Sequence, residues 1–348
     1  MHHDETGRRV ELVCAVADPR VVELLLEPPG DLPDGVRVRG WDLSAPATDP
    51  DEITVVVPPY VAAARLDLLA DLPNLRLVQT LTAGFDAVAP HLPAGVALAN
   101  AVGVHDASTS ELAVGLVIAA LRGLPGFVRD QDRARWDPVQ RRSLADRRVL
   151  VLGAGGVGSA VLARLLPFEV SVTVVASRAR HDARLGEVHG VDELPDLLPG
   201  HDVVIVTVPL NEATRGMVDA AFLAAMPDDA LLVNVARGPV VDTGALVAEL
   251  RTGRLQAALD VTDPEPLDPG HELWHLPGVL ISPHVGGATS AMMPRALALL
   301  RSQLGRIVSG EPLLGVVVAT PWSAGTGRGG GGRRPGPAPQ TGVLDSRA

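Results

Sequence analysis

The residues best suited to chemistry are an arginine, a glutamate and a histidine, each of which follows a short apolar run. They are Arg237, Glu265 and His284. Each run is typical of a buried β-strand, and in open α/β sheets ligands bind beyond the carboxyl ends of the strands, so we expect the three side chains to converge on one cleft. Arginine can bind a carboxylate and polarise a carbonyl, and histidine can deliver a proton near neutral pH. A glutamate bonded to the far ring nitrogen would favour the imidazolium and fix its orientation. Together with a hydride donor, such a set suits the reduction of a 2-oxo acid.

A nucleotide-binding signature lies upstream of these residues. The apolar strand Val149–Leu152 runs directly into Gly153-Ala154-Gly155-Gly156-Val157-Gly158, and a helical pattern follows. Gly153 permits a tight turn, Gly155 lets the backbone approach a pyrophosphate, and Gly158 allows close packing of helix on strand. The helix N-terminus adds free N–H groups for the phosphates. A GxGxxG pattern alone is a weak signal, but a strand before it and a helix after it predict a dinucleotide site that also includes Gly156 and Val157.

The choice of cofactor should be visible at the end of the next strand. An NAD enzyme usually has an acid there to bind the ribose hydroxyls. Here the strand is followed by Ser177 and Arg178, and no acid occurs before Asp182. Because a guanidinium pairs well with phosphate oxygens, we predict NADP(H) as the preferred cofactor, with NAD(H) possible. The alternative is that Arg178 only faces solvent, since the chain contains no lysine and every basic residue is arginine.

Short apolar runs alternate with helical patterns along most of the chain, which predicts a doubly wound α/β fold. Residues 101–286 carry the nucleotide signature and should form a dinucleotide-binding domain. This domain would be inserted into a second Rossmann-like, flavodoxin-like domain, the substrate domain, made of residues 1–100 and 287–318. A Gly-, Pro- and Arg-rich tail, residues 319–348, is predicted to be disordered. The expected strands and the main helices are Val10–Val16, Ile53–Val57, Leu75–Thr80, Val149–Leu152, Val170–Ala176, Val203–Val208, Leu231–Val235, Gln256–Asp260, Val279–Ser282, and Ser110–Leu121, Val157–Leu166, Ala220–Ala225, Thr243–Thr252 and Ala288–Val308.

Composition limits the classes of function. The net charge of -11 argues against nucleic acid as the main partner, because phosphate backbones attract basic surfaces. No apolar run approaches the roughly 18–20 residues of a membrane helix, and the N-terminus lacks the apolar core of a secretory signal. The single cysteine, Cys14, excludes an internal disulfide and reads as a buried strand thiol. The histidines show no ligand spacing, so no metal site is expected. These features favour a cytoplasmic protein.

The ordered motifs resemble those of the D-isomer-specific 2-hydroxyacid dehydrogenases. The resemblance spans about residues 50 to 312, and the order of five motifs is more specific than any one of them. The motifs are Gly153–Gly158, Val208-Pro209 before Asn211–Thr214, Asn234–Asp242, Asp260–Leu267 and Pro283–Gly287.

The resemblance implies roles for individual residues. Arg237 would bind the substrate, His284 would be the acid and base, and Glu265 would be its partner. Ala83 and Gly84 would hold the substrate carboxylate through backbone N–H groups. Five positions match residues that line the nicotinamide half of the cofactor site: Val208, Pro209, Thr214, Ala236 and Asp260. For Asp260 the alternative is a strand-end residue without a ligand.

Within this family the run Ser177-Arg178-Ala179-Arg180 resembles the NADP-preferring glyoxylate/hydroxypyruvate reductases. The expected function is therefore an NADP(H)- or NAD(H)-linked oxidoreductase acting on a small 2-oxo or 2-hydroxy acid, and family members imply a homodimer. The alternative from another class is a non-catalytic, dinucleotide-sensing protein like the corepressors that reuse this fold.

Overall fold

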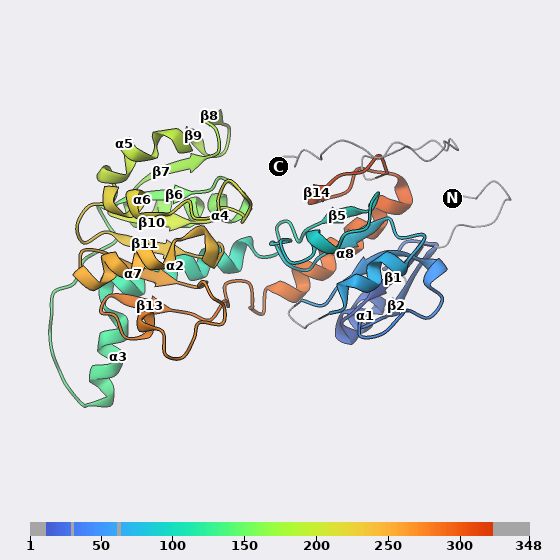
Figure 1. Cartoon of the computed structure of the whole chain (residues 1–348), viewed down its shortest axis with the longest axis horizontal. Coiled ribbons are helices and arrows are strands. Elements are labelled where there is room, and N and C mark those ends of the chain that lie inside the picture. The colour runs from blue at the N-terminus through green and yellow to red at the C-terminus, as the bar shows by residue number, and fades with distance from the viewer. Residues whose placement is uncertain (1–11, 29–30, 61–63, 323–348) are drawn as a thin grey trace. The chain divides into compact units, whose positions relative to one another are not determined.

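The computed structural model describes residues 12–28, 31–60 and 64–322 and divides the chain into two compact units (Figure 1). Unit 1 contains the chain up to Val104 and again from Ser290 onward, and unit 2 contains His105–Thr289. Near the two ends of unit 2, the hydroxyls of Ser108 and Thr289 form a hydrogen bond of 2.6 Å. The chain therefore enters and leaves unit 2 at neighbouring points. Most of the predicted tail, from residue 323 onward, lies outside the described residues.

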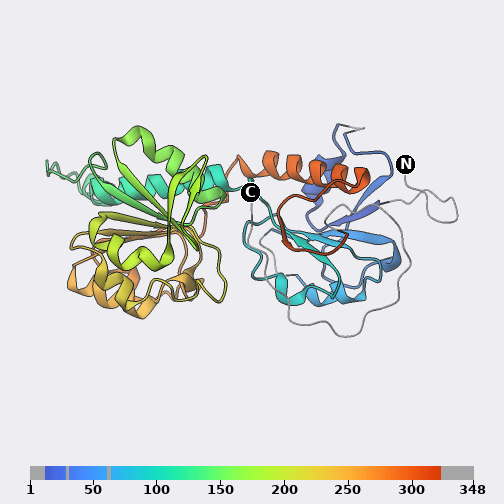
Figure 2. The same cartoon turned by 90° about the horizontal axis from the view of Figure 1, so that it is seen from above.

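Unit 1 is built on a six-stranded sheet of order β14-β5-β4-β3-β1-β2. All neighbouring strands are parallel except β14, which is antiparallel to β5. Apolar side chains of α1 and α8 cover one face of the sheet, and apolar residues of a short 3-10 helix, Leu66–Asp71, pack on the other (Figure 2). The elements are β1 Leu12–Val16, α1 Pro19–Leu26, β2 Val36–Gly40, β3 Ile53–Val57, β4 Leu77–Gln79, β5 Ala97–Ala99, α8 Met292–Ser309 and β14 Val316–Val318.

Unit 2 is built on an eight-stranded sheet of order β13-β12-β11-β10-β6-β7-β9-β8, parallel except between β8 and β9. Helices α2 and α4 pack on one face and α5, α6 and α7 on the other (Figure 2). Chain order reverses between β6 and β10, so this is the point where an open α/β sheet binds its ligand. The elements are α2 Asp106–Arg122, α3 Leu124–Asp132, β6 Arg148–Leu152, α4 Gly156–Leu165, β7 Ser171–Ala176, β8 Arg180–Asp182, β9 Gly186–Gly190, α5 Leu194–Leu197, β10 Val203–Val206, α6 Ala220–Ala225, β11 Leu231–Asn234, α7 Thr243–Thr252, β12 Gln256–Leu259 and β13 Val279–Ile281.

The predicted fold class, two doubly wound α/β units, is confirmed. Every strand expected from an apolar run is present within a few residues, although Val10 at the start of the first lies outside the described part. The strands that sequence analysis missed are short or weakly apolar, such as β5 with three residues and β2 with its alternating arginines. The last long helix begins at Met292 rather than Ala288, because the backbone amides of Ala288 and Thr289 form tight turns with Val285 and Gly287.

Among the described helices, none is by itself long and apolar enough to cross a membrane. Only α2 and α3 taken together reach that length and composition, and they are bent by 65° where they join.

Candidate functional site

Three consecutive strands of unit 2 place the predicted catalytic residues at one edge of the sheet. Strands β11, β12 and β13 are neighbours and run parallel, and Arg237, Glu265 and His284 follow them in that order. The ring nitrogen Nδ1 of His284 hydrogen-bonds Oε1 of Glu265, and both side chains are partly exposed. The structure therefore brings the predicted acid and its carboxylate partner into direct contact.

Asp260 organises the loop that carries His284. Its carboxylate is only 3% exposed and accepts three hydrogen bonds, from Ser282 Oγ at 2.6 Å and from the amides of Val285 and Gly286 at 2.9 Å each. The Asp260 carbonyl also accepts the amide of His284 at 2.7 Å. Such a set of charge-assisted bonds holds a loop firmly.

The backbone of His284 lies in the left-handed region, with φ at +52°. This conformation is uncommon for a residue other than glycine and persists where surrounding contacts impose it. Here the bonds to Asp260 on both sides of the histidine supply those contacts. The ring is thus presented by an ordered loop and not by a freely rotating segment.

A buried asparagine shapes the turn that carries Arg237. Asn234, 1% exposed at the end of β11, accepts the amide of Ala236 and donates to the carbonyl of Arg237, each at 3.0 Å. A Cβ on the next residue, Gly238, would lie 1.8 Å from the carbonyl oxygen of Thr262, in the segment that leads to Glu265. Only glycine permits this close approach, so the Arg237 and Glu265 segments are packed backbone to backbone. The arginine itself is half-buried, and its Nη1 donates to the Ala236 carbonyl at 2.8 Å.

The glycine-rich turn between β6 and α4 has the geometry that a dinucleotide requires. Gly153 has φ at +123°, and a Cβ there would collide with Thr207. A Cβ on Gly158 would lie 1.8 Å from the carbonyl oxygen of Gly153, whereas nothing lies within 4 Å of the position a Cβ would take on Gly155. Two glycines thus allow tight packing, and the third leaves the exposed backbone open to an approaching pyrophosphate. The half-buried Val157 follows in the first turn of α4.

The loop after β10 contains the next group of predicted cofactor residues. The Thr214 hydroxyl is buried and donates to the carbonyl of Pro209 at 2.6 Å, and it accepts the amide of Asn211 at 2.9 Å. These bonds close the loop from Val208 to Thr214 at the carboxyl end of the strand beside β6. Thr214 therefore shapes this loop, whether or not its side chain contacts a ligand.

Ser177 and Arg178 follow β7 and are both exposed. In the described part of the chain Arg178 has no acidic partner, whereas Arg180 lies 3.9 Å from the carboxylate of Asp182. A free guanidinium at the end of the second strand of a nucleotide-binding unit fits a phosphate on the adenosine ribose.

The predicted substrate loop lies in unit 1. The carbonyl oxygens of Thr82, Ala83 and Gly84 accept hydrogen bonds from Thr80 Oγ1, Asn100 Nδ2 and Thr82 Oγ1, at 2.9, 2.8 and 2.6 Å. Within the described residues, the amide groups of Ala83 and Gly84 have no acceptor. A loop with its carbonyls occupied and its amides available is suited to binding a carboxylate.

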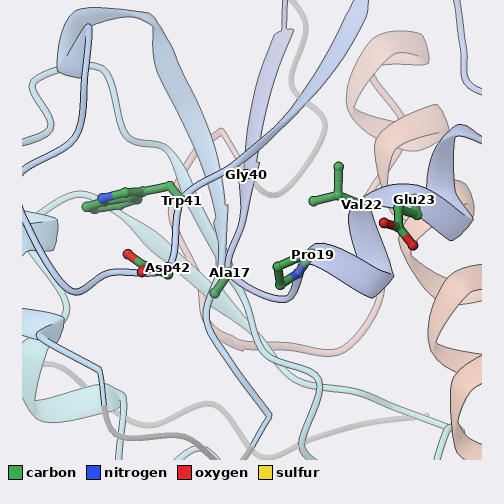
Figure 3. Close-up of a pocket in the computed structure, with 7 residues that line it drawn as sticks. All are labelled: Ala17, Pro19, Val22, Glu23, Gly40, Trp41 and Asp42. Carbon is green, nitrogen blue, oxygen red and sulfur yellow. The ribbon is translucent and has the colours of Figure 1, made fainter.

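A surface hollow of about 540 Å³ lies elsewhere in unit 1, where β1 and β2 end beside α1 (Figure 3). None of the predicted site residues lines it. Its walls are formed by Ala17, Pro19, Val22, Glu23, Gly40, Trp41 and Asp42. Among the described residues, no three His, Cys, Asp or Glu side chains are grouped so that they could hold a metal ion.

Sequence reasoning did not assign a role to Asn234, Gly238 or Ser282. Asn234 and Gly238 lie inside a motif that was identified, and Ser282 directly precedes another. The only local signal for Asn234 is a polar residue that ends an apolar strand. The contacts of Gly238 and Ser282 join segments that are distant in the sequence, and spacing alone does not reveal them.

Comparison with known proteins agrees with this geometry. Residues 114–286 match the NAD binding domain of the D-isomer specific 2-hydroxyacid dehydrogenases. Glyoxylate/hydroxypyruvate reductase A of Arabidopsis thaliana is 31% identical over 277 residues, which cover 78% of this chain and 87% of that protein.

Two solved structures are also similar. A D-isomer specific 2-hydroxyacid dehydrogenase from Xanthobacter autotrophicus, in complex with NADPH and MES, is 31% identical with a TM-score of 0.75, covering 88% of this chain and 98% of that one. An NADPH-dependent glyoxylate/hydroxypyruvate reductase from Sinorhizobium meliloti, in complex with NADP and sulfate, is 26% identical with a TM-score of 0.76, covering 90% and 100%. This chain therefore belongs to the family of D-isomer specific 2-hydroxyacid dehydrogenases.

Proposed function

We propose that the protein reduces a small 2-oxo acid of the glyoxylate or hydroxypyruvate type to the corresponding 2-hydroxy acid, with NADPH as the preferred reductant. The observation that carries this proposal is the His284–Glu265 pair, held by the Asp260 loop two strands away from Arg237. The pair lies at the same sheet edge as the glycine-rich turn after β6. Relatives named as glyoxylate or hydroxypyruvate reductases support the substrate class.

In the proposed mechanism, the reduced nicotinamide supplies the hydride. The Arg237 guanidinium binds the substrate carboxylate and draws electron density from the carbonyl oxygen. The charge that develops on this oxygen is neutralised by a proton from Nε2 of His284, since Nδ1 is bonded to Glu265. The Glu265 carboxylate stabilises the imidazolium before the proton leaves and keeps the ring in place. From the resemblance to the family, the amides of Ala83 and Gly84 are proposed to bind a substrate carboxylate.

The preference for NADPH rests on Ser177 and Arg178. Both are exposed after β7, no acid stands between them and Asp182, and two similar structures contain NADPH or NADP. We expect Arg178→Ala to raise KM for NADPH about tenfold or more and to change KM for NADH little, because only NADPH offers a 2′-phosphate. Arg184→Ala, which alters an exposed arginine six residues further on, is the control. Equal loss with both cofactors would place the phosphate elsewhere.

The activity is tested with purified protein and four acids: glyoxylate, hydroxypyruvate, pyruvate and phenylpyruvate. Oxidation of NADPH and of NADH is followed by absorbance. We expect turnover to be fastest with one of the first two acids and NADPH, and His284→Asn to lower kcat by about 10²-fold or more while dinucleotide binding persists. No oxidation with any of the acids would contradict the proposed substrate class. Dinucleotide binding without turnover would favour the non-catalytic, dinucleotide-sensing alternative.

The exposed apolar residues of unit 2 also support a homodimer. Five of them occur on α3 and the segment after it: Leu124, Phe127, Val128, Trp136 and Val139. Trp136 is 94% exposed, which is unusual for so large an apolar side chain. A second copy of this chain is the proposed partner of these five residues, the α3 surface, because exposed apolar side chains in number favour association.

A further inference from the structure

Gly156 is not one of the three glycines that a dinucleotide fingerprint requires, yet a Cβ there would collide with another side chain. A Cβ at this position would lie 2.2 Å from Oδ2 and 2.8 Å from Oδ1 of Asp106, the first residue of α2. The Asp106 carboxyl group therefore occupies the space beside the first residue of α4. Gly156 itself is exposed.

The start of α4 is where the dinucleotide motif is expected to bind a diphosphate. The dinucleotide motif directs the pyrophosphate to the exposed backbone at the start of α4, where N–H groups and the helix dipole favour an anion. The Asp106 carboxyl group supplies the three atoms nearest to the position that a Cβ would take on Gly156. A carboxylate beside a bound diphosphate would repel it, because like charges a few ångströms apart and partly shielded from water interact strongly.

The surroundings of Asp106 favour its neutral form. Partial burial raises the pKa of the carboxyl, and the nearby His105 opposes this shift only in part. Within the described residues the carboxyl group has no hydrogen-bond partner, so no donor stabilises its charge. A protonated carboxyl group could instead donate its O–H to a phosphate oxygen.

The other charged groups on the elements that pack against α2 lie farther from the Asp106 carboxyl group. On α4 the only one is Arg164, in the last turn. Asp260 and His284 follow β12 and β13 near Thr109, and the charged residues of α3 lie past the other end of α2. Of the groups on these elements, only His105 has a coulombic effect on Asp106.

We propose that Asp106 belongs to the diphosphate subsite and that the cofactor binds with the uptake of one proton by this carboxyl group. The inference rests on the dinucleotide-binding part of the proposed function. It predicts that affinity falls as pH rises through the range in which free Asp106 ionises.

The test is isothermal titration calorimetry with ADP-ribose, which carries the diphosphate but has neither nicotinamide nor 2′-phosphate. Titrations from pH 5.5 to pH 8.5 compare the wild-type protein with Asp106→Asn, and with Glu111→Gln as an acid-to-amide control on the same helix. We expect the wild-type Kd to rise by up to about tenfold per pH unit above the pKa of Asp106. The Asn variant should show a nearly flat profile and bind about tenfold more tightly than the wild type at pH 8.5. Glu111→Gln should behave as the wild type.

Repeating the titration in two buffers with different ionisation heats measures the proton uptake directly. The wild type should take up as much as one proton per site that Asp106→Asn does not. Asp106→Ser also removes the charge and should behave as the Asn variant. Agreement between the two variants shows that the effect comes from the lost charge and not from a folding defect of one of them.

Identical pH profiles for the wild type and both variants, or weaker binding by both variants at every pH, would overturn the inference and leave the proposed function intact. If the wild type binds neither ADP-ribose nor NADP⁺ at any pH, the proposed function fails as well. An independent check is Gly156→Ala. We expect it to lower Tm when Asp106 is present and to lower Tm much less in Asp106→Ser, because the shorter serine leaves room for the new methyl group.

Discussion

The backbone amide of His284 donates a hydrogen bond of 2.7 Å to the carbonyl oxygen of Asp260. The two residues follow neighbouring strands, so this bond joins two turns at one edge of the sheet. The Asp260 carboxylate also accepts hydrogen bonds from the Ser282 hydroxyl, which precedes the histidine, and from the amides of Val285 and Gly286, which follow it. One buried acid therefore determines both the path of the loop and the left-handed backbone of His284.

Replacing this acid should disturb the loop more than the sheet. In Asp260→Asn, one oxygen is replaced by an amide that cannot accept, so a buried donor loses its partner at a cost of about 1–3 kcal/mol. We expect kcat/KM to fall about 10- to 100-fold. Amide hydrogen exchange should quicken in residues 282–287, with a small change elsewhere. Ser282→Ala, which removes only one of the four bonds, is the milder control. Unchanged exchange in this loop would show that the Asp260 bonds do not hold it.

Glu265→Gln should separate catalysis from cofactor binding. A neutral amide cannot stabilise the imidazolium of His284 as a carboxylate does, so we expect kcat to fall about 10²-fold while the Kd for NADPH stays within about twofold. Steady-state kinetics and a fluorescence titration measure the two quantities. Glu272→Gln provides the matched control, since Glu272 pairs with Arg251 on the surface and should affect neither. Equal losses in kcat and in cofactor affinity would assign Glu265 a structural role.

The proposed dimer gives a prediction for the α3 surface. Val128 is 60% exposed, and a charge there would be buried without a partner if a second copy covers it. We expect Val128→Asp to shift the molecular mass in solution from that of a dimer toward 36.2 kDa, the mass of one chain. Leu166→Asp, at a similarly exposed apolar position on the same unit, should leave the mass unchanged. A wild-type protein that is monomeric at all concentrations would contradict the proposal.

Cys14 should not react in the folded protein. Complete burial in β1 raises the pKa of its thiol to about 12. We expect no reaction with a thiol reagent at pH 8 until the chain unfolds, and then one thiol per chain. Because the unfolded thiol ionises at its ordinary pKa, the stability linked to this proton is fully present below that value and is lost as pH rises toward 12. Cys14→Ala should reduce this alkaline loss. Rapid labelling of the native protein would contradict the assigned burial.

Sequence patterns predicted the parts of this protein that depend on local chemistry. The strand, glycine turn and helix around Gly153 are contiguous, and the roles of Gly153, Gly155 and Gly158 can be stated from the motif. The partnership of Glu265 with His284 followed from the chemistry of an acid near a histidine and from the resemblance to a known family. The direct contact between Glu265 and His284 could be expected because the two residues follow neighbouring parallel strands, which end at the same edge of the sheet.

Features that depend on contacts between distant segments could not be predicted in this way. Asp260 was assigned to the cofactor site, and only the structure shows how many of its bonds go to the loop after β13. Gly156 was grouped with the phosphate-binding glycines, and only the structure shows that the space beside it holds the carboxyl group of Asp106, fifty residues earlier. The short strands β5 and β14 are defined by their pairing across the sheet and carry too few residues to show a period.

The hydroxyl pair Ser108–Thr289 has a consequence for how the chain can fold. Unit 2 is inserted into unit 1 between Val104 and Ser290. Because the two ends of unit 2 lie together, the folded unit 2 holds the two points of insertion near each other. The closure entropy that a flexible insertion of this length would impose on unit 1 is therefore small once unit 2 has formed. Expressed alone, residues 105–289 should form a self-contained domain with adjacent termini, which makes them suitable for circular permutation.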